Sequence, residues 1–261
     1  MIELYHNDMS VCAQKVRFAL TEKKLKWEGH HLNLRAGDQQ KPEYLKLNPN
    51  AVVPTLADDG TVIIGSTVIN EYLDDAYPEP RLRPADSLSR ARMRLWTKQL
   101  DEGVHAATSV LSTCIAFRYQ KLARGQEELE KFHRQMPDPA KRERSRDTIT
   151  KGVDSIYFAD AAKRFDRLLA DMETALSEGQ WLAGKEFSLA DIGYAPYMAR
   201  LEHLQLHFLW DKRPHVPAWF DRLKERRGYQ EGIGDWLNAS YLTLMKEKGA
   251  EVQSRLKAIL G

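Results

Sequence analysis

The chain has 261 residues, of which 43% are hydrophobic and 29% are charged, a composition typical of folded globular proteins. Its formal net charge of only +2 does not indicate nucleic acid or an anionic membrane as a partner. No apolar run approaches the roughly 18–20 residues that a membrane-spanning helix needs, and we expect no signal peptide. The two cysteines, Cys12 and Cys114, lie far apart, which favours a reducing compartment, the cytoplasm, over a disulfide framework.

The first 80 residues alternate between strand and helix patterns. Strands are expected at 2–6, 27–34, 52–56 and 62–64. The first two should be parallel, because a helix connects them. The third contains Pro54, which cannot donate to a sheet and therefore lies at an edge or beside a ligand. We expect Ser66 to cap the helix after the fourth strand, so this region is predicted to be a small α/β layer.

The beginning of the first helix, residues 10–17, has the features of an anion-binding site. Ser10 stands at the N-cap position, and apolar residues follow it at helical spacing. The N–H groups of a first helical turn have no partner within the helix, and the helix dipole is positive there. A thiolate is one such anion, and Cys12 lies in the same turn.

Beyond a proline-rich linker the strand patterns disappear, and the rest of the chain is predicted to be helical. Helices are expected at 87–124, 153–177, 192–201 and 235–260, and another is expected to start in the stretch 214–220. The highly charged stretch 125–152 is predicted to be a solvent-exposed, partly helical excursion. Ser188 and Asp191 form a capping box before a nearly all-apolar helix, which we expect at the centre of this half.

Several motifs together resemble the glutathione S-transferase superfamily over nearly the whole chain. They are Ser-x-Cys-x-x-Lys-Val-Arg at 10–17, Leu47-Asn48-Pro49 followed by Val53-Pro54-Thr55-Leu56, Ser66 before the third helix, Ser188-Leu189-Ala190-Asp191, and Pro217-Ala218-Trp219-Phe220. The stretches 9–12 and 51–56 are most similar to the zeta-related bacterial branch that contains tetrachlorohydroquinone reductive dehalogenase. The bacterial lignin β-etherases are a second comparison.

The resemblance implies two domains, an α/β thioredoxin-like domain at 1–80 and an all-α domain at 87–261, joined by a linker at 81–86. The first would bind glutathione, the co-substrate, and the second a small hydrophobic electrophile. The implied enzyme is a glutathione S-transferase, in which the glutathione thiolate attacks the electrophile. The resemblance also implies a cytoplasmic homodimer.

By the same resemblance, Ser10 and Cys12 are the candidate catalytic residues. A free thiol has a pKa near ~8.5, and a hydrogen bond to a charged acceptor is worth about 1.5–3 kcal/mol, or one to two pKa units. A hydroxyl at Ser10 and the helix end therefore suffice to favour the thiolate. In the dehalogenase branch, the cysteine matching Cys12 forms a mixed disulfide with glutathione. The structural alternatives are a plain N-cap at Ser10 and a small packed side chain at Cys12.

The candidate residues for binding glutathione are Gln39, Gln40, Val53, Pro54, Gly65 and Ser66. A cis-proline at Pro54 would expose the backbone of Val53, which would pair with the cysteinyl part of glutathione. Either Gln39 or Gln40 would meet the glycine carboxylate, unless both belong to a solvated loop. Ser66 would hold the γ-glutamyl carboxylate.

One position departs from the family pattern. Many members have an acidic residue just before that serine, paired with the ligand's amino group, but this chain has Gly65. Asp101 or Glu102, from the same chain or from a partner chain, is a possible substitute. The departure makes a non-catalytic binding protein on the same fold one alternative function. A glutathione-dependent reductive dehalogenase or thiol oxidoreductase that uses Cys12 is the other.

The residues expected to bind the electrophile are His105, Arg118 and Tyr119, on the long helix that faces the acceptor pocket in this family. Phe117 lies beside them, and Phe208 and Trp210 are candidates for the roof of the pocket, with packing in the core as the alternative. The histidines show none of the spacings of metal ligands, so we predict no metal site.

Overall fold

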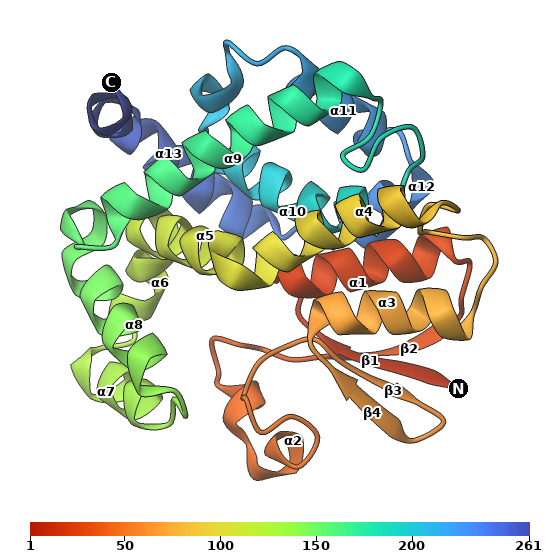
Figure 1. Ribbon diagram of the computed structural model, residues 1–261. Coiled ribbons are helices and arrows are strands. Elements are labelled where there is room, and N and C mark those ends of the chain that lie inside the picture. The colour runs from red at the N-terminus through yellow and green to blue at the C-terminus, as the bar shows by residue number, and fades with distance from the viewer.

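A mixed sheet forms the first part of the chain in the computed structural model, which covers residues 1–261 (Figure 1). Its strands are β1 (Ile2–His6), β2 (Trp27–His31), β3 (Thr55–Asp58) and β4 (Thr61–Ile64), in the spatial order β2-β1-β3-β4. β1 and β2 are parallel, and β3 is antiparallel to both β1 and β4. Parallel pairing follows from the helical crossover between β1 and β2, as the sequence predicts.

Helix α1 (Val11–Glu22) joins the sheet to the helical part of the molecule and is buried along nearly its whole length. On one side it packs against α3 (Ser66–Ala76), and on the other against α12 (Arg227–Gly232). The approach of α12 is so close that a Cβ at Gly232 would lie 2.6 Å from the backbone nitrogen of Phe18. The buried Arg17 completes the contact, because its Nε donates to the Gly232 carbonyl at 2.9 Å.

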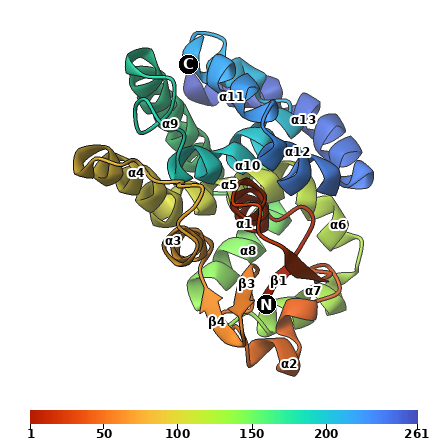
Figure 2. The ribbon, with the colours of Figure 1, turned by 90° about the vertical axis from the view of Figure 1, so that its right-hand side faces the viewer.

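All the longer elements after residue 80 are helical, as predicted (Figure 2). They are α4 (Ser87–Gln99), α5 (His105–Ser112), α6 (Arg118–Leu122), α7 (Gln126–Arg134), α8 (Pro139–Lys151), α9 (Phe158–Glu178), α10 (Leu189–His203), α11 (His215–Lys224), α12 and α13 (Ala239–Leu260). α10 is buried from Leu189 to Leu201, which confirms its central position. None of the helices is both long and apolar enough to cross a membrane.

The prediction of a single long helix at 87–124 is wrong. The chain forms α4, a π-helical turn at Leu100–Val104, α5, a second π-helical turn at Thr113–Phe117, and α6. Gly103 has a φ of 140°, which only glycine adopts readily, and it breaks the helical geometry in the first π-helical turn. Each π-helical turn also inserts backbone into the helix and rotates the side chains that follow.

The excursion at 125–152 is a hairpin of α7 and α8 (Figure 1). Its outer faces are charged and exposed, as predicted, but its inner face is buried at His133, Thr148 and Ile149. The prediction of a solvent-exposed segment is therefore only half right. The turn around Pro137 borders a cavity, which gives the hairpin a place in the candidate site.

The segment at 81–86 is tied to both halves of the molecule. The N–H of Leu82 donates to Oδ1 of Asp74 at 2.8 Å, and its carbonyl accepts from the N–H of Leu189 at 2.8 Å. Asp74 also forms a fully buried ion pair with Lys23, whose ammonium donates to two carbonyls of the same region. These contacts fix the direction in which α4 leaves the α/β layer.

Candidate active site

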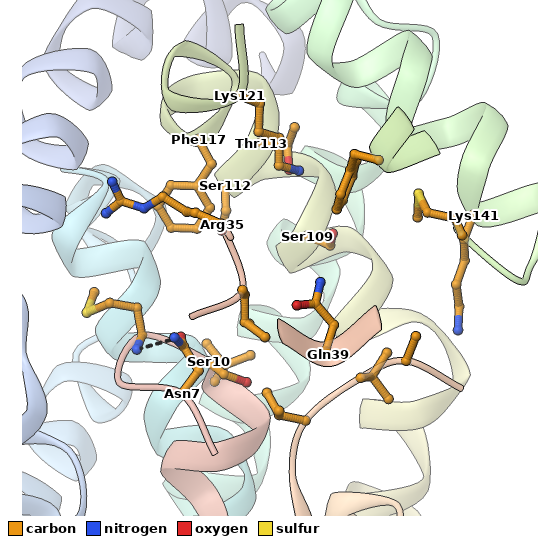
Figure 3. A pocket seen from close by; sticks show the side chains of 18 of the residues that line it. Asn7, Ser10, Arg35, Gln39, Ser109, Ser112, Thr113, Phe117, Lys121 and Lys141 are labelled. Atoms are coloured by element: carbon orange, nitrogen blue, oxygen red, sulfur yellow. Dashed lines mark hydrogen bonds between the residues drawn. The ribbon is translucent and has the colours of Figure 1, made fainter. Parts of the chain in front are cut away.

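A cavity of about 460 Å³ lies between the loops at the end of the sheet and the wall of helices α5 to α8 (Figure 3). Ser10, Gln39 and Val53 line it from the α/β side. His105 and Phe117 line it from the helical side. A cleft of this size suits a small molecule, since ligand sites occupy about 300–1,000 Å³.

Ser10 is the N-cap of α1, as predicted. Its backbone is extended (φ −72°, ψ 115°), and its Oγ accepts a hydrogen bond from the N–H of Ala13 at 3.3 Å. The side chain is half-buried and borders the cavity, and no other hydrogen bond occupies its oxygen. The hydroxyl proton is therefore available to a ligand at the positive end of α1.

The peptide bond between Val53 and Pro54 is cis, as the resemblance implies. Strand β3 begins at Thr55 rather than at Val52, because the turn through Pro54 takes the preceding residues out of the sheet. Val53 is buried and lines the cavity, yet neither its N–H nor its carbonyl makes a hydrogen bond. Its backbone is free to pair with an extended peptide, whereas Pro54 does not line the cavity.

The two neighbouring glutamines differ. Gln39 is buried and lines the cavity, and its Oε1 has no hydrogen-bond partner. The Nε2 of Gln40 donates to the carbonyl of Phe132 on α7 at 3.4 Å. Gln39 is thus the side chain with a free amide, and Gln40 connects this loop to the α7–α8 hairpin.

Ser66 is the first residue of α3 and not its cap. The cap position belongs to Gly65, whose φ of 87° directs the chain into the helix without a side-chain hydrogen bond, so the predicted cap at Ser66 is wrong. Behind Ser66, the hydroxyl of Thr67 accepts from Nζ of Lys15 at 2.9 Å and donates to Oδ1 of Asp101 at 3.2 Å. A carboxylate of the same chain therefore lies beside the N-terminus of α3.

Cys12 is half-buried and lies next to the cavity without lining it. Its Sγ is 3.4 Å from Nδ1 of His105, which is itself exposed and borders the cavity. The hydroxyl of Tyr197 lies 3.9 Å from the sulfur and 3.4 Å from the same imidazole nitrogen. Three polar groups from α1, α5 and α10 thus meet at one point.

The electrostatics around Cys12 favour its thiolate. Burial on its own would raise the pKa of the thiol, but the charge of His105 and the hydrogen bond to it act in the opposite direction. Lys15 and the hydroxyl of Ser66 add to this effect, and the pKa of Cys12 falls from 9.0 to about 6. The Cys12 thiolate in turn raises the pKa of His105. The two shifts act in the same sense, and together they favour an ion pair of the Cys12 thiolate with the His105 imidazolium.

Of the predicted electrophile-binding residues, only His105 lines the cavity. The guanidinium of Arg118 instead donates to the carbonyls of Ile149 and Thr150 on the far side of the helix, and Tyr119 is exposed to solvent. The π-helical turn at Thr113–Phe117 is the reason, because it rotates α6 relative to the expected helix.

Several cavity residues carried no signal in the sequence. The rotation of α6 brings Gln120, Lys121 and Arg124 to the cavity, and Tyr241 reaches it from the final helix. Phe208 and Trp210, the expected roof, do not line it. The charge of the 125–152 stretch hid the apolar residues Leu129, Phe132 and Met136, which a helical-period analysis of that stretch alone would have put on one face.

Family models match both parts of the chain: the glutathione S-transferase N-terminal domain at residues 4–81 and the C-terminal domain at residues 139–222. Protein LigF of Sphingobium sp. strain SYK-6 is 30% identical over 88% of this chain and 92% of its own length. The chain belongs to the glutathione S-transferase family. Glutathione is the co-substrate of this family.

Other glutathione S-transferase relatives span the same length. Tetrachloro-p-hydroquinone reductive dehalogenase of Sphingobium chlorophenolicum is 25% identical over 88% of this chain and 94% of its own. The crystal structure of the β-etherase LigF from Sphingobium sp. strain SYK-6 superimposes with a TM-score of 0.80 at 29% identity, covering 90% of this chain and 99% of the other. These relatives confirm the predicted branch and fold of this glutathione S-transferase.

Proposed function

We propose that this protein transfers glutathione to a small hydrophobic electrophile and that Ser10 stabilises the reacting thiolate. The observation that carries the proposal is the free hydroxyl proton of Ser10 at the N-terminus of α1, bordering a cavity. A hydrogen bond to a charged sulfur is worth about 1.5–3 kcal/mol, and the helix dipole adds to it. Together they lower the pKa of the glutathione thiol enough to make the thiolate abundant at neutral pH.

The free polar groups of the cavity suit the tripeptide. The N–H and carbonyl of Val53 would pair with the cysteinyl residue like an added strand. The Nε2 of Gln39 would donate to the glycine carboxylate, and this choice over Gln40 follows from the contact of Gln40 with Phe132. The division into a glutathione-binding domain at 1–80, a linker at 81–86 and an acceptor domain at 87–261 belongs to the same proposal.

The γ-glutamyl end of glutathione would lie at the N-terminus of α3. The N–H and hydroxyl of Ser66 would bind its carboxylate. Asp101, held beside this helix end by Thr67, would take the place of the acidic residue that Gly65 lacks and bind the ammonium. A partner chain is then not needed to complete the site.

In the proposed reaction, the glutathione sulfur forms a bond to an electrophilic carbon of the acceptor. Either a leaving group departs with the electron pair of its bond, or a double bond opens and takes up a proton from solvent. The cavity positions the two reactants and excludes water from them. Ser10 then donates the hydrogen bond that keeps the sulfur ionised until it attacks.

A second candidate reaction is favoured by the Cys12–His105 ion pair. The thiolate of Cys12 would attack the sulfur of a glutathione conjugate and form a mixed disulfide. The carbon–sulfur bond breaks, and the carbon leaves with its electrons and takes up a proton, so the acceptor is reduced. A second glutathione would then release Cys12 and produce glutathione disulfide. The relative named a reductive dehalogenase makes this candidate relevant.

The two reactions are separated by the variants Ser10→Ala and Cys12→Ser, assayed with 1-chloro-2,4-dinitrobenzene for conjugation and with a halogenated hydroquinone for reduction. We expect Ser10→Ala to lower kcat/KM for conjugation about 100-fold, a loss of about 2.7 kcal/mol of transition-state stabilisation. Cys12→Ser should retain conjugation and lose any reduction.

The opposite pattern, with conjugation lost in Cys12→Ser and kept in Ser10→Ala, would contradict our assignment. Calorimetry of the wild-type protein with glutathione tests the non-catalytic alternative. An absence of saturable heat at millimolar glutathione would favour a binding protein on this fold over either enzyme.

We also propose that the protein is a homodimer. Val62 on β4, Val68 on α3, and Leu88 and Leu95 on α4 are large apolar side chains that remain exposed in the single chain. Leu88 and Leu95 are seven residues apart and therefore lie on one face of α4. Light scattering coupled to gel filtration would decide between one chain and two. The cytoplasmic location stays a prediction.

A further inference from the structure

The cavity carries an unequal distribution of charge. Its cationic lining residues are Arg35, Lys121, Arg124, Lys141 and Arg200. Asp138 is its one acidic lining residue. A cavity built for an uncharged apolar acceptor needs no such excess of positive charge, so the excess is informative about the ligand.

Four of these five cations already have partners in the protein. The partners are Glu128 for Arg124, Asp138 for Lys141, the Tyr241 ring and hydroxyl for Arg35, and the Ser112 hydroxyl with the Met9 carbonyl for Arg200. The ammonium of Lys121 makes no hydrogen bond and no ion pair, and its Nζ lies 5.7 Å from the centre of the Phe132 ring. It is the cation that the protein leaves without a partner.

The surroundings of Lys121 penalise its charge. Burial lowers the pKa of its ammonium to about 8, because the half-buried charge loses part of its solvation and has no carboxylate as a partner. A lysine in this state gains more from an incoming anion than a solvated lysine does, since an opposite charge restores the favoured charged form. Lys121 therefore indicates where an anionic group would be bound.

The wall around Lys121 is apolar. Phe117, Leu129, Phe132 and Met136 all line the cavity from its helical side, contributed by the second π-helical turn and by the α7–α8 hairpin. Figure 3 shows Lys121 and Phe117 on the opposite side of the cavity from Ser10. A ligand that reaches from Ser10 to Lys121 thus passes an apolar surface and ends at a positive charge.

We propose that the electrophilic acceptor carries an acidic group, which Lys121 binds while the aromatic wall holds the apolar body of the molecule. The inference rests on the proposed function, because it concerns the second substrate of that reaction. The two carboxylates of glutathione have their own candidate partners, Gln39 and Ser66, on the α/β side. The acidic group that Lys121 binds therefore belongs to the acceptor. The reactive carbon of the acceptor then points toward Ser10.

The test uses two acceptors with the same reacting chlorodinitrophenyl ring, one anionic and one neutral: 4-chloro-3,5-dinitrobenzoate and its methyl ester. In both, the glutathione sulfur bonds to the ring carbon, chloride leaves with the bonding electrons, and the thiol proton goes to solvent. The wild-type protein should prefer the acid, with kcat/KM at least tenfold above that of the ester. In Lys121→Met the ratio of acid to ester should fall about tenfold.

Lys131→Met is the matched control, because Lys131 lies on α7, is exposed, and does not line this cavity. It removes one positive charge from the helix that follows α6 in the chain and should keep the wild-type ratio. An unchanged ratio in Lys121→Met would overturn the inference. So would a rise in KM for glutathione with no change in the ratio, because Lys121 would then belong to the glutathione subsite.

A binding measurement separates failure of this inference from failure of the proposed function. The unreactive 4-amino-3,5-dinitrobenzoate, titrated calorimetrically, should bind wild-type protein about tenfold more tightly than it binds Lys121→Met. If neither chlorinated acceptor reacts but this difference is present, the transferase proposal fails and the anion site stands. If both acceptors react and the difference is absent, the anion site fails alone.

Discussion

Two helices of this protein begin at a serine N-cap, α1 at Ser10 and α10 at Ser188, and they use it differently. At α10, the Ser188 hydroxyl and the Asp191 carboxylate form a complete capping box, and both residues are wholly buried. Asp191 also accepts from the N–H of Leu182 at 3.0 Å and from Nε1 of Trp219 at 2.8 Å. Every polar group at this helix end has a partner within the protein.

At α1, the Ser10 side chain makes one hydrogen bond, and the first turn carries no acidic residue. The positive end of this helix is left to a cavity and to the sulfur of Cys12. The comparison shows that the same local feature, a serine N-cap, can have two roles. At α10 it stabilises the fold, because the buried Asp191 carboxylate neutralises the positive end of the helix. In our proposal it serves binding at α1, where no such carboxylate is present.

The largest expected effect concerns the N-terminus of α10, where every polar group has a hydrogen-bond partner. In Asp191→Ala, four buried donors lose their acceptor: the backbone N–H groups of Leu182 and Ser188, the hydroxyl of Ser188 and the indole of Trp219. Each costs about 1–3 kcal/mol when left unpaired, so the free energy of unfolding should fall by about 3–5 kcal/mol. Urea denaturation measures it, with Asp211→Ala, at an exposed position without side-chain hydrogen bonds, as control. A loss under 1 kcal/mol would mean that the capping box is not a main contributor to stability.

The second prediction concerns Cys12 in the first turn of α1. The pKa of Cys12 is lowered to about 6, so the thiolate forms as the pH rises through 6, and alkylation by iodoacetamide should accelerate over the same range. In His105→Gln the imidazolium is lost, and the midpoint should move up by at least one unit, slowing alkylation at pH 6 by at least about fivefold.

Cys114 supplies an internal control for the alkylation experiment, because burial raises its pKa to about 12 and keeps it unreactive. His207→Gln, at an exposed histidine far from the cysteine in the chain, should leave the midpoint near 6. If the midpoint also stays near 6 in His105→Gln, then Lys15 and the helix dipole carry the effect, and the ion pair is not its cause.

The two helix ends also show what the sequence could reveal. Both caps were predictable, because a cap depends on residues within one turn, and the strand–helix order followed from local spacing as well. The pairing of Cys12 with His105 joins residues 93 positions apart and had no local signal. The expectation of electrophile binding at Arg118 and Tyr119 depended on an unbroken helix. The π-helical turn before them rotated Lys121 to the cavity, and a periodic pattern does not show such an insertion.

The smallest expected effect compares the two serines directly. Ser188→Ala removes a buried hydroxyl that accepts from Ala190 and donates to Asp191, and it should lower the free energy of unfolding by about 2 kcal/mol. Ser10→Ala removes a single bond from Ala13 at 3.3 Å and should cost about 0.5–1 kcal/mol. In a protein of this size, the difference in unfolding free energy between the two variants corresponds to a Tm difference of only about 2–4 °C. If Ser10→Ala cost as much stability as Ser188→Ala, Ser10 would be a structural cap first. Its expected loss of activity would then need a refolding control before it was assigned to the thiolate.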